Sequence, residues 1–515
     1  MRKIYTCMTT LFLMMLYSTS LLGGNWTAYV TELSNSLVPI NLSTNTPGTA
    51  FPGVVDLINP VITPDGTTLY VSVSGSNEVA VFNLVAETLI TMIPASSPAG
   101  MAITPDGAFV YVVNQNPGGL DTITKIDVAT NTVATVIPTG STNGNSQDIA
   151  ITPDGLHAYI VKENDNLVIP IDLTTDVVGA PILVEFAPVA IAITPNGETA
   201  YVVNSISNSV TPITIATNMP GPSIPVGADP LGIAITSDGT TVYVTNGLDG
   251  TVSAISTATN MVIATIPVGA SPYNVAITPD SKFVYVTNGA PPGDVVIIET
   301  TTNTVVGTIS FVNATTGIAI SPDQAPTAAF NFTSPNTFDA SQSVSPVGSI
   351  ASYFWDFGDG TTLVTTSPIV THNYAVSGMY SIRLTVTNTA GTSTTQTYTG
   401  HMIGKHGGLS ATITEIITVI NPSPVSPSHF AGKIIENKFA TQTDIIHRLK
   451  WIPSSDPSVV EYQLFRNGKL IAVIPASGPF IYLDHNRREH VPDTYILIAI
   501  TASGVQSLPV IAVVD

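Results

Sequence analysis

The titratable residues that could do chemistry are scarce in the repeated part of this chain. Residues 25–323 contain one histidine, His157, and neither arginine nor cysteine. Their cationic side chains are three lysines: Lys125, Lys162 and Lys282. Acid–base or nucleophilic catalysis gathers a base, a cationic stabiliser or metal ligands at one site. This inventory predicts a protein that is not an enzyme, although calcium chemistry built on carboxylates alone stays open.

The histidine has a structural explanation. His157 stands two residues before Tyr159, at a position where equivalent stretches carry Thr68 and Phe109. A position that tolerates threonine and phenylalanine is typical of a strand. We therefore expect His157 to be a strand residue and not a catalytic base.

The aspartates recur more regularly. Asp65, Asp106 and Asp154 stand in Pro-Asp-Gly turns, and a regular series of carboxylates could bind metal ions. In such a turn a short carboxylate accepts nearby backbone N–H groups while the glycine takes a positive φ. Calcium sites draw several oxygens from one region, whereas each turn offers one carboxylate. The spacing favours turn-stabilising aspartates over metal sites.

An internal repeat supplies the elements that must hold these side chains. A phrase ITPDG, or a close variant, begins at Ile62, Ile103, Ile151, Ile193, Ile235, Ile277 and Ile320. A second phrase begins at Tyr29, Tyr70, Tyr111, Tyr159, Tyr201, Tyr243 and Tyr285. The tyrosines are 41, 41, 48, 42, 42 and 42 residues apart. The 48-residue spacing reflects an insertion near residues 140–145.

Each unit reads as four short strands. From Gly232 these are GIAITSDG, TTVYVTNGLDG, TVSAISTATN and MVIATIPVGASP, separated by turn residues. A four-stranded meander of this length is one propeller blade. Residues 25–323 resemble the YVTN family of β-propeller repeats, which implies a seven-bladed propeller. The tyrosines are expected to pack between blades with their hydroxyls hydrogen-bonded, and an aromatic binding platform is the alternative. A β-solenoid would have a shorter period, and a string of sandwiches one of about a hundred residues.

The two phrases are out of step at the ends of the array. The first tyrosine phrase, within Ala28 to Leu42, has no ITPDG phrase before it. The last ITPDG-type phrase, within Gly317 to Gln324, has no tyrosine phrase after it. An open ring would leave two unpaired sheet edges. We therefore expect the two half-repeats to pair and close the ring.

Three loops that differ between blades are candidates for binding. NQNPGGLD (114–121), KENDN (162–166) and NGAPPGD (288–294) each follow the Tyr-Val strand of a blade, so they should gather on one face. The candidate binding residues are Asn114, Asp121, Lys162, Glu163, Asp165, Asn288 and Asp294. Solvated turns without a ligand are the alternative.

Residues 1–24 read as a secretory signal peptide. Arg2 and Lys3 precede an apolar run and then small residues, with cleavage expected between Ser20 and Asn25. A retained membrane anchor is the alternative; no other segment resembles a membrane span. The single cysteine, Cys7, lies in this leader. The mature chain is thus expected to be exported, with neither disulfides nor a membrane span.

A different pattern begins after the repeats. The stretches YFWDFGDG (353–360) and HNYAVSGMYSIRLTVTNTAG (372–391) resemble a polycystic kidney disease (PKD) domain, an immunoglobulin-like β-sandwich, over residues 325–400. The resemblance implies a spacer or binding module of surface proteins. Trp355 and Tyr374 are expected in its core. Asp356 and Asp359 are weak calcium candidates, with a tight turn as the favoured alternative.

The rest of the chain is expected to hold a linker and one further domain. Residues 401–425 include a stretch rich in proline and serine and are predicted to be the linker. Residues 426–515 are similar to a fibronectin type III sandwich, with Trp451, Tyr462 and Tyr495 in the core. The predicted fold class is therefore all-β: a seven-bladed β-propeller followed by two immunoglobulin-like β-sandwich domains.

Composition and charge narrow the function. The 515 residues are 44% hydrophobic and 10% charged, which excludes a disordered chain. Residues 25–323 hold 23 Asp and Glu against three Lys, so the net charge of -20 resides there. Such a surface repels nucleic acid and anionic lipid.

Three functions remain open from the sequence. The expected one is a secreted or cell-surface interaction and adhesion protein that binds protein or glycan ligands and needs no cofactor, with calcium as an open possibility. A structural surface-layer component, which the combination of YVTN repeats and a PKD domain implies, is the alternative. A propeller enzyme such as a lactonase is a third possibility.

Overall fold

The computed structural model describes residues 26–515 except 33–35, 52–53, 55, 74, 116–119, 141–144, 375, 421–422, 439–442 and 489. The predicted signal peptide lies outside these residues. The predicted all-β fold class is confirmed, since one short 3-10 helix, η1 (Leu409–Ala411), accompanies the strands. Within the described part of the chain, no helix is long and apolar enough to cross a membrane.

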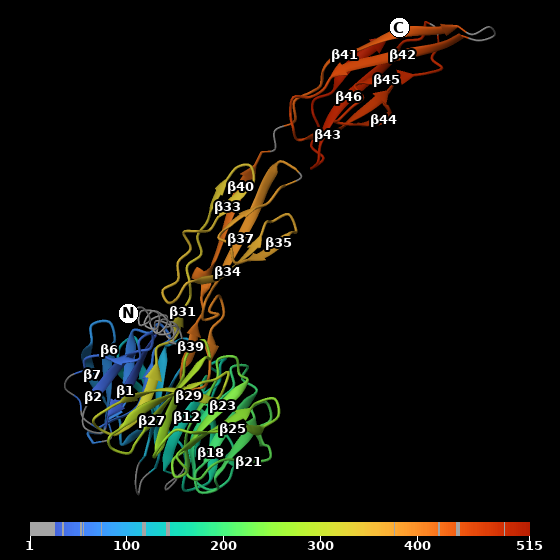
Figure 1. Ribbon diagram of the computed structural model, residues 1–515. Coiled ribbons are helices and arrows are strands. Elements are labelled where there is room, and N and C mark those ends of the chain that lie inside the picture. The colour runs from blue at the N-terminus through green and yellow to red at the C-terminus, as the bar shows by residue number, and fades with distance from the viewer. Residues whose placement is uncertain are drawn as a thin grey trace, which may run out of the picture. The chain divides into compact units, whose positions relative to one another are not determined.

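Seven antiparallel sheets form the blades of a propeller (Figure 1). In each blade the strand that ends in the ITPDG phrase packs against its equivalents in the two neighbouring blades, so it lies innermost. The innermost strands are β4 (Leu57–Ile62), β8 (Pro98–Ile103), β12 (Ser146–Ile151), β17 (Pro188–Ile193), β22 (Pro230–Ile235), β26 (Pro272–Ile277) and β30 (Thr315–Ile320).

The Tyr-Val phrase forms the second strand of every blade. These strands are β1 (Thr27–Glu32), β5 (Thr68–Val73), β9 (Phe109–Asn114), β13 (His157–Lys162), β18 (Thr199–Asn204), β23 (Thr241–Asn246) and β27 (Phe283–Asn288). The third strands are β2 (Ser36–Asn41), β6 (Glu78–Asn83), β10 (Thr122–Asp127), β14 (Leu167–Asp172), β19 (Ser209–Thr214), β24 (Thr251–Ser256) and β28 (Asp294–Glu299). His157 is therefore a strand residue, as predicted.

The outer edge of each blade is more exposed. Four blades end in a seven-residue strand: β7 (Thr88–Pro94), β11 (Thr132–Pro138), β25 (Met261–Pro267) and β29 (Thr304–Ser310). The other three end in shorter pieces: β3 (Thr46–Pro47), β15 (Val177–Val178) with β16 (Ile182–Leu183), and β20 (Met219–Pro220) with β21 (Ile224–Pro225). Proline and glycine near these pieces limit the ladder at the edge.

The ring closes through its two ends, as predicted. The closing blade has the order β3-β2-β1-β30, with Ala28 opposite Ile320 and Tyr29 opposite Ala319. Beyond the strands, the indole nitrogen of Trp26 donates to Asp323 Oδ1 over 3.0 Å. The unmatched phrases at the two ends of the array are thus the two parts of one sheet.

The repeated residues have structural functions. Tyrosine hydroxyls donate to an asparagine of the following blade: Tyr159 to Asn218 over 2.7 Å, and Tyr285 to Asn45, across the closure, over 2.8 Å. In the Pro-Asp-Gly turns a carboxylate accepts the backbone N–H two residues later, as Asp154 does from Leu156 over 2.9 Å. Both predictions are confirmed.

A second compact unit comprises residues 328–343, 353–384 and 413–515. Its first aromatic core contains the predicted Trp355 and Tyr374, both buried, around Phe338. The strands here are β32 (Asn331–Thr333), β33 (Thr337–Asp339), β34 (Ile350–Asp356), β35 (Thr362–Thr365), β36 (Ile369–Thr371), β37 (Gly378–Asn388) and β40 (Thr412–Val419). They form the sheets β32-β33-β36 and β35-β34-β37-β40.

The C-terminal residues form two further sheets, β41-β42-β45 and β44-β43-β46-β47. Their strands are β41 (Ser428–Lys438), β42 (Thr443–Ile452), β43 (Val459–Arg466), β44 (Lys469–Pro475), β45 (Ile481–Asp484), β46 (Asp493–Thr501) and β47 (Val510–Val514). Trp451, Tyr462 and Tyr495 are buried in the core, as predicted. The fibronectin type III assignment stays a prediction.

The predicted linker is wrong for most of its length. Within residues 401–425, β39 (Ile403–His406) pairs with β31 (Asp323–Gln324) and β38 (Thr397–Tyr398), and β40 belongs to a four-stranded sheet. Residues 385–412 belong to the same compact unit as the propeller. Because Ile403 and Tyr398 are buried against the blades, this stretch is core and not a spacer.

Candidate functional site

The ring has two ends, which are defined by the connections that lie at each. The antiparallel order puts all Pro-Asp-Gly turns at one end, called here the turn face. It puts the connections between second and third strands at the other end, called here the loop face. The three loops predicted to bind all leave second strands, β9, β13 and β27, and so belong to the loop face.

Two of the predicted binding residues are buried structural groups. Asn114 donates to the hydroxyls of Thr122 (3.0 Å) and Thr124 (2.8 Å) inside its own blade. Asn288 donates to the Val268 carbonyl over 2.8 Å and to Asp294 over 2.6 Å. Both side chains are buried, so they hold the ends of strands and cannot meet a partner.

Asp121 and Lys162 also differ from the prediction. Lys162 Nζ lies 2.8 Å from Asp121 Oδ2 with both side chains buried, and it also donates to Thr139. The Asp121 carboxylate accepts the backbone N–H and the hydroxyl of Ser146. Burial lowers the pKa of Lys162, against the opposing effect of Asp121. The pair joins two neighbouring blades.

The remaining candidates stay partly accessible. Glu163, Asp165 and Asp294 are half-buried on the loop face. Glu163 accepts from Asn145 and Gln147. These carboxylates contribute negative charge to the loop face.

Exposed apolar side chains lie beside them on the loop face. Phe186, Ile206 and Leu248 are 65%, 73% and 79% exposed on loops of successive blades. Hydrogen bonds link these loops: Phe186 N–H donates to Ser207, Asp229 N–H to Asn208, and Leu248 N–H to Ala228. The loop face therefore carries both acidic and exposed apolar side chains, and the apolar ones were not among the predicted binding residues.

Every innermost strand is irregular at the same level near the loop face. Its pairing with the second strand shifts register around Asn59, Gly100, Gln147, Val189, Leu231–Gly232, Tyr273–Asn274 and Thr316. A β-bulge leaves its extra residue out of the ladder and re-aims its side chain. The result is a ring of bulged residues around the axis of the propeller.

Close packing at this level requires glycine in one blade. A Cβ on Gly232 would lie 2.6 Å from the carbonyl oxygen of Tyr273 and 3.0 Å from the Cα of Asn274. A side chain there would push the innermost strands of two blades apart.

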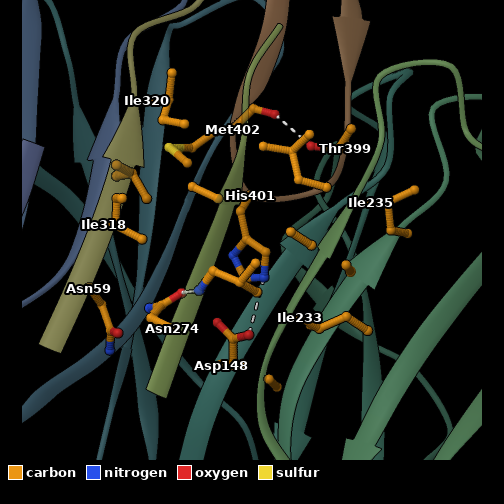
Figure 2. A pocket seen from close by; sticks show the side chains of 18 of the residues that line it. Asn59, Asp148, Ile233, Ile235, Asn274, Ile318, Ile320, Thr399, His401 and Met402 are labelled. Carbon is orange, nitrogen blue, oxygen red and sulfur yellow. Dashed lines mark hydrogen bonds and ion pairs between the residues drawn. The ribbon is translucent and has the colours of Figure 1, made fainter. Parts of the chain in front are cut away.

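A segment from far along the chain occupies the turn-face end of the axis. This inserted segment, residues 395–408, consists of β38, a short loop and β39 (Figure 2). The Tyr398 hydroxyl donates to the Ile103 carbonyl, and the Ile151 N–H donates to the Gly400 carbonyl over 2.9 Å. Gly400 has φ +94°, and a Cβ there would lie 2.8 Å from the Ile193 nitrogen. The segment thus contacts the turn-face ends of three innermost strands, β8, β12 and β17.

His401 lies at the tip of the inserted segment and meets Asp148 of β12 (Figure 2). The two atoms, His401 Nε2 and Asp148 Oδ2, are 3.1 Å apart. Burial lowers the pKa of His401, but Asp148 and the carbonyls of Ile191 and Met101 outweigh it and raise the pKa to about 9. His401 is therefore an imidazolium at neutral pH, paired with a carboxylate.

A cavity of about 340 Å³ lies between the inserted segment and the ring of bulged residues. Thr399, His401 and Met402 line its turn-face end, and Gln147, Tyr273 and Asn274 line it toward the loop face. We call this cavity the cup. Its walls are largely aliphatic, with Ile233, Ile235 and Ile318 among them (Figure 2).

The cup offers hydrogen bonding more than acid–base chemistry. His401 and Asp148 are the two ionisable groups other than Tyr273 among the described residues that line it. No group of three or more His, Cys, Asp or Glu side chains suited to a metal occurs in the described part of the chain. The weak calcium candidates are used in a turn: Asp356 accepts from Gly358, and Asp359 accepts from Thr361 and contacts His372.

His401 was not among the predicted site residues, because it stands outside the repeats, in the stretch expected to be a linker. One signal was available: the phrase TYTGHMIG (397–404) is apolar and aromatic, unlike the proline- and serine-rich residues that follow it. Burial of Tyr398 and Ile403 accounts for that composition.

Two parts of the chain match known protein families. Residues 58–136 match the family model "Lactonase, 7-bladed beta-propeller", and residues 321–402 match "PKD domain". A microbial collagenase of Vibrio alginolyticus is 46% identical over 63 residues, which span 12% of this chain and 8% of the collagenase.

Two solved structures share the propeller fold. A functionally unknown protein of Desulfotomaculum acetoxidans is 20% identical, with 57% of this chain and 98% of that chain covered and a TM-score of 0.51. A periplasmic gluconolactonase of Pseudomonas aeruginosa is 14% identical, with 57% and 99% covered and a TM-score of 0.52. The chain thus combines a lactonase-like seven-bladed β-propeller region with a PKD domain.

Proposed function

We propose that this chain is an exported, surface-associated binding protein whose propeller takes its ligand at the loop face and does not catalyse a reaction. The observation that carries the proposal is the inserted segment, which bonds to Ile103 and Ile151 at the turn-face ends of β8 and β12. We therefore expect a ligand to approach the cup from the loop face. The PKD domain, and the stretch shared with a collagenase, support an extracellular setting.

The charges in the cup support binding over catalysis. Both oxygens of Asp148 accept backbone N–H groups, from Ile149 over 2.9 Å and from Ile191 over 3.0 Å, besides the contact to His401. A carboxylate satisfied in this way is a poor general base, and an imidazolium of raised pKa holds its proton.

The test blocks one face of the propeller at a time. Leu248→Cys on the loop face and Val85→Cys on the turn face, 79% and 81% exposed, are made in a Cys7→Ser background and coupled to a maleimide polymer. Labelled protein is then applied to printed arrays of glycans and of extracellular-matrix proteins. We expect the polymer to abolish binding at Leu248→Cys and to spare it at Val85→Cys. Equal binding by both conjugates would contradict the proposal.

A lactone-hydrolysing enzyme is the second candidate, favoured by the family match over residues 58–136. That activity would rest on His401 and Asp148, because they are the paired ionisable groups of the cup. Turnover of aldonolactones that disappears in His401→Gln would establish the enzyme in place of the binding protein. Absence of turnover by a folded, ligand-binding protein would support the first proposal.

A further inference from the structure

We infer that the cup receives the terminal unit of a neutral saccharide chain, end-on, from the loop face. This inference rests on the proposed binding function and adds the chemical class of the ligand and its direction of entry. Three properties of the cup carry it: its closed floor, its balanced charges, and its mixed lining.

The floor is closed by the inserted segment. Tyr398 and Gly400 bond to three innermost strands, through Ile103 and Ile151 by hydrogen bonds and through Ile193 by close packing. His401 and Met402 of this segment line the cup, so a chain that enters from the loop face would meet them. The cup therefore fits the end of a chain and not its middle.

The charges inside the cup are balanced. The imidazolium of His401 and the carboxylate of Asp148 neutralise one another 3.1 Å apart, and backbone donors saturate the carboxylate. A charged ligand group would lose its hydration without meeting an unpaired counter-charge, which is unfavourable. A neutral group avoids that cost.

Hydrogen-bonding groups remain available on the wall. Asn274 uses its oxygen to accept the Val275 N–H over 2.7 Å, while its amide nitrogen has no hydrogen bond among the described residues. The Asn59 side chain likewise forms no hydrogen bond in the described part of the chain, and both residues are half-buried on the bulged ring. Together the amides offer donors and an acceptor, the combination that a sugar hydroxyl can use in both directions.

The other walls are apolar. Val189, Ile233 and Ile318 line the cup beside these amides, and Tyr273, 44% exposed, lies toward the loop face. A saccharide ring has hydroxyl groups around its edge and C–H groups on its faces. Aliphatic and aromatic walls next to amides suit that ring better than they suit a purely polar ligand.

The experiment titrates the full chain by calorimetry with linear hexasaccharides of glucose, mannose, galactose and N-acetylglucosamine. A glucosamine hexamer and an oligogalacturonate serve as cationic and anionic comparators. We expect one neutral series to bind and the charged comparators to bind at least tenfold more weakly. We also expect a cyclic form, or one with a bulky group on its terminal unit, to lose at least tenfold in affinity.

Three variants locate the site. Val189→Trp fills the cup, whereas Val177→Trp adds the same side chain on the outer strand β15, where Val177 is 59% exposed. Asn274→Asp keeps the acceptor for Val275 and removes the donor. We expect Val189→Trp and Asn274→Asp to weaken neutral-saccharide binding at least tenfold and Val177→Trp to leave it unchanged, with all three melting as the unmodified protein does.

Outcomes for the two proposals differ. Binding of a neutral saccharide that survives both cup variants would overturn the inference. The protein could instead bind charged ligands or matrix proteins, and lose that binding when the polymer is coupled at Leu248→Cys. That result would overturn the inference and leave the proposed function standing. Binding that no loop-face block affects would overturn both.

Discussion

His401 and Asp148 show how one residue pair can join distant parts of a sequence. One stands in the fourth repeat of the propeller and the other in a segment that follows the PKD pattern, and their side chains meet 3.1 Å apart. The exposed fraction of the His401 side chain is 23%, so solvent weakens the pair little. The pair should therefore be measurable by titration.

We expect His401→Gln to remove a pH dependence from the melting of the propeller. An unfolded histidine has a pKa of about 6.5, and the folded pKa of His401 is raised to about 9. Because the folded value is the higher, the stabilisation is complete below the unfolded pKa and is lost as the pH rises through the folded one. The loss should be on the order of 3 kcal/mol. A difference in Tm between the unmodified protein and His401→Gln that does not change with pH would contradict a stabilising ion pair between His401 and Asp148.

Asp121 and Lys162 provide a second residue-scale prediction. Asp121→Asn leaves the buried ammonium of Lys162 without its counter-charge and should lower the free energy of unfolding by about 3–5 kcal/mol. Combining it with Lys162→Met removes the charge and should restore most of the loss. Chemical denaturation measures both variants; a double variant as unstable as the single one would show that the charges are not the cause.

At the scale of elements, the inserted segment depends on one glycine. Gly400→Ala places a Cβ 2.8 Å from the Ile193 nitrogen at φ +94°. We expect the segment to move away from Ile193. The Ile151 amide, which donates to the Gly400 carbonyl, should then exchange its hydrogen faster, with its free energy of protection lower by about 1–3 kcal/mol. Gly360→Ala is the matched control, since Gly360 has φ +90° with no atom within 4 Å of a Cβ. Equal exchange at Ile151 in both variants would count against the dependence.

The closing blade gives a further element-scale prediction. Deleting Ala28 to Leu42 removes the partners of β30 and bares its edge. We expect aggregation or a broad, early melting transition in calorimetry, with large species in size-exclusion chromatography. A monomeric deletion variant with unchanged Tm would refute the closure as a source of stability.

The repeats made most of this fold predictable. A fixed spacing of ITPDG and Tyr-Val phrases specifies strand order, blade number and closure, because each blade repeats one local pattern. The site was not predictable in the same way. Asn114 and Lys162 stand at loop boundaries, where burial depends on the neighbouring blade, and the position of His401 depends on a contact some 250 residues away in sequence. Local patterns carry no record of such contacts.

At the scale of the whole molecule, the C-terminal sandwich is expected to fold without the rest of the chain. The C-terminal core around Trp451, Tyr462 and Tyr495 is complete within its own two sheets. A fragment of residues 426–515 should therefore be soluble and all-β by circular dichroism, with dispersed amide signals in proton NMR. An unfolded fragment would show that this core needs the rest of the chain.

The inserted segment also decides where this chain can be divided and recombined. A propeller cut out after Gln324 would keep its seven blades but lose the inserted segment from the turn-face end of its axis. A PKD module cut out from Ala325 would carry the inserted segment without the blades that bury its side chains Tyr398 and Ile403. Because β40 (Thr412–Val419) completes the sheet β35-β34-β37-β40, a gene fusion should place its junction after Val419 and transfer the propeller, the inserted segment and the PKD sandwich together.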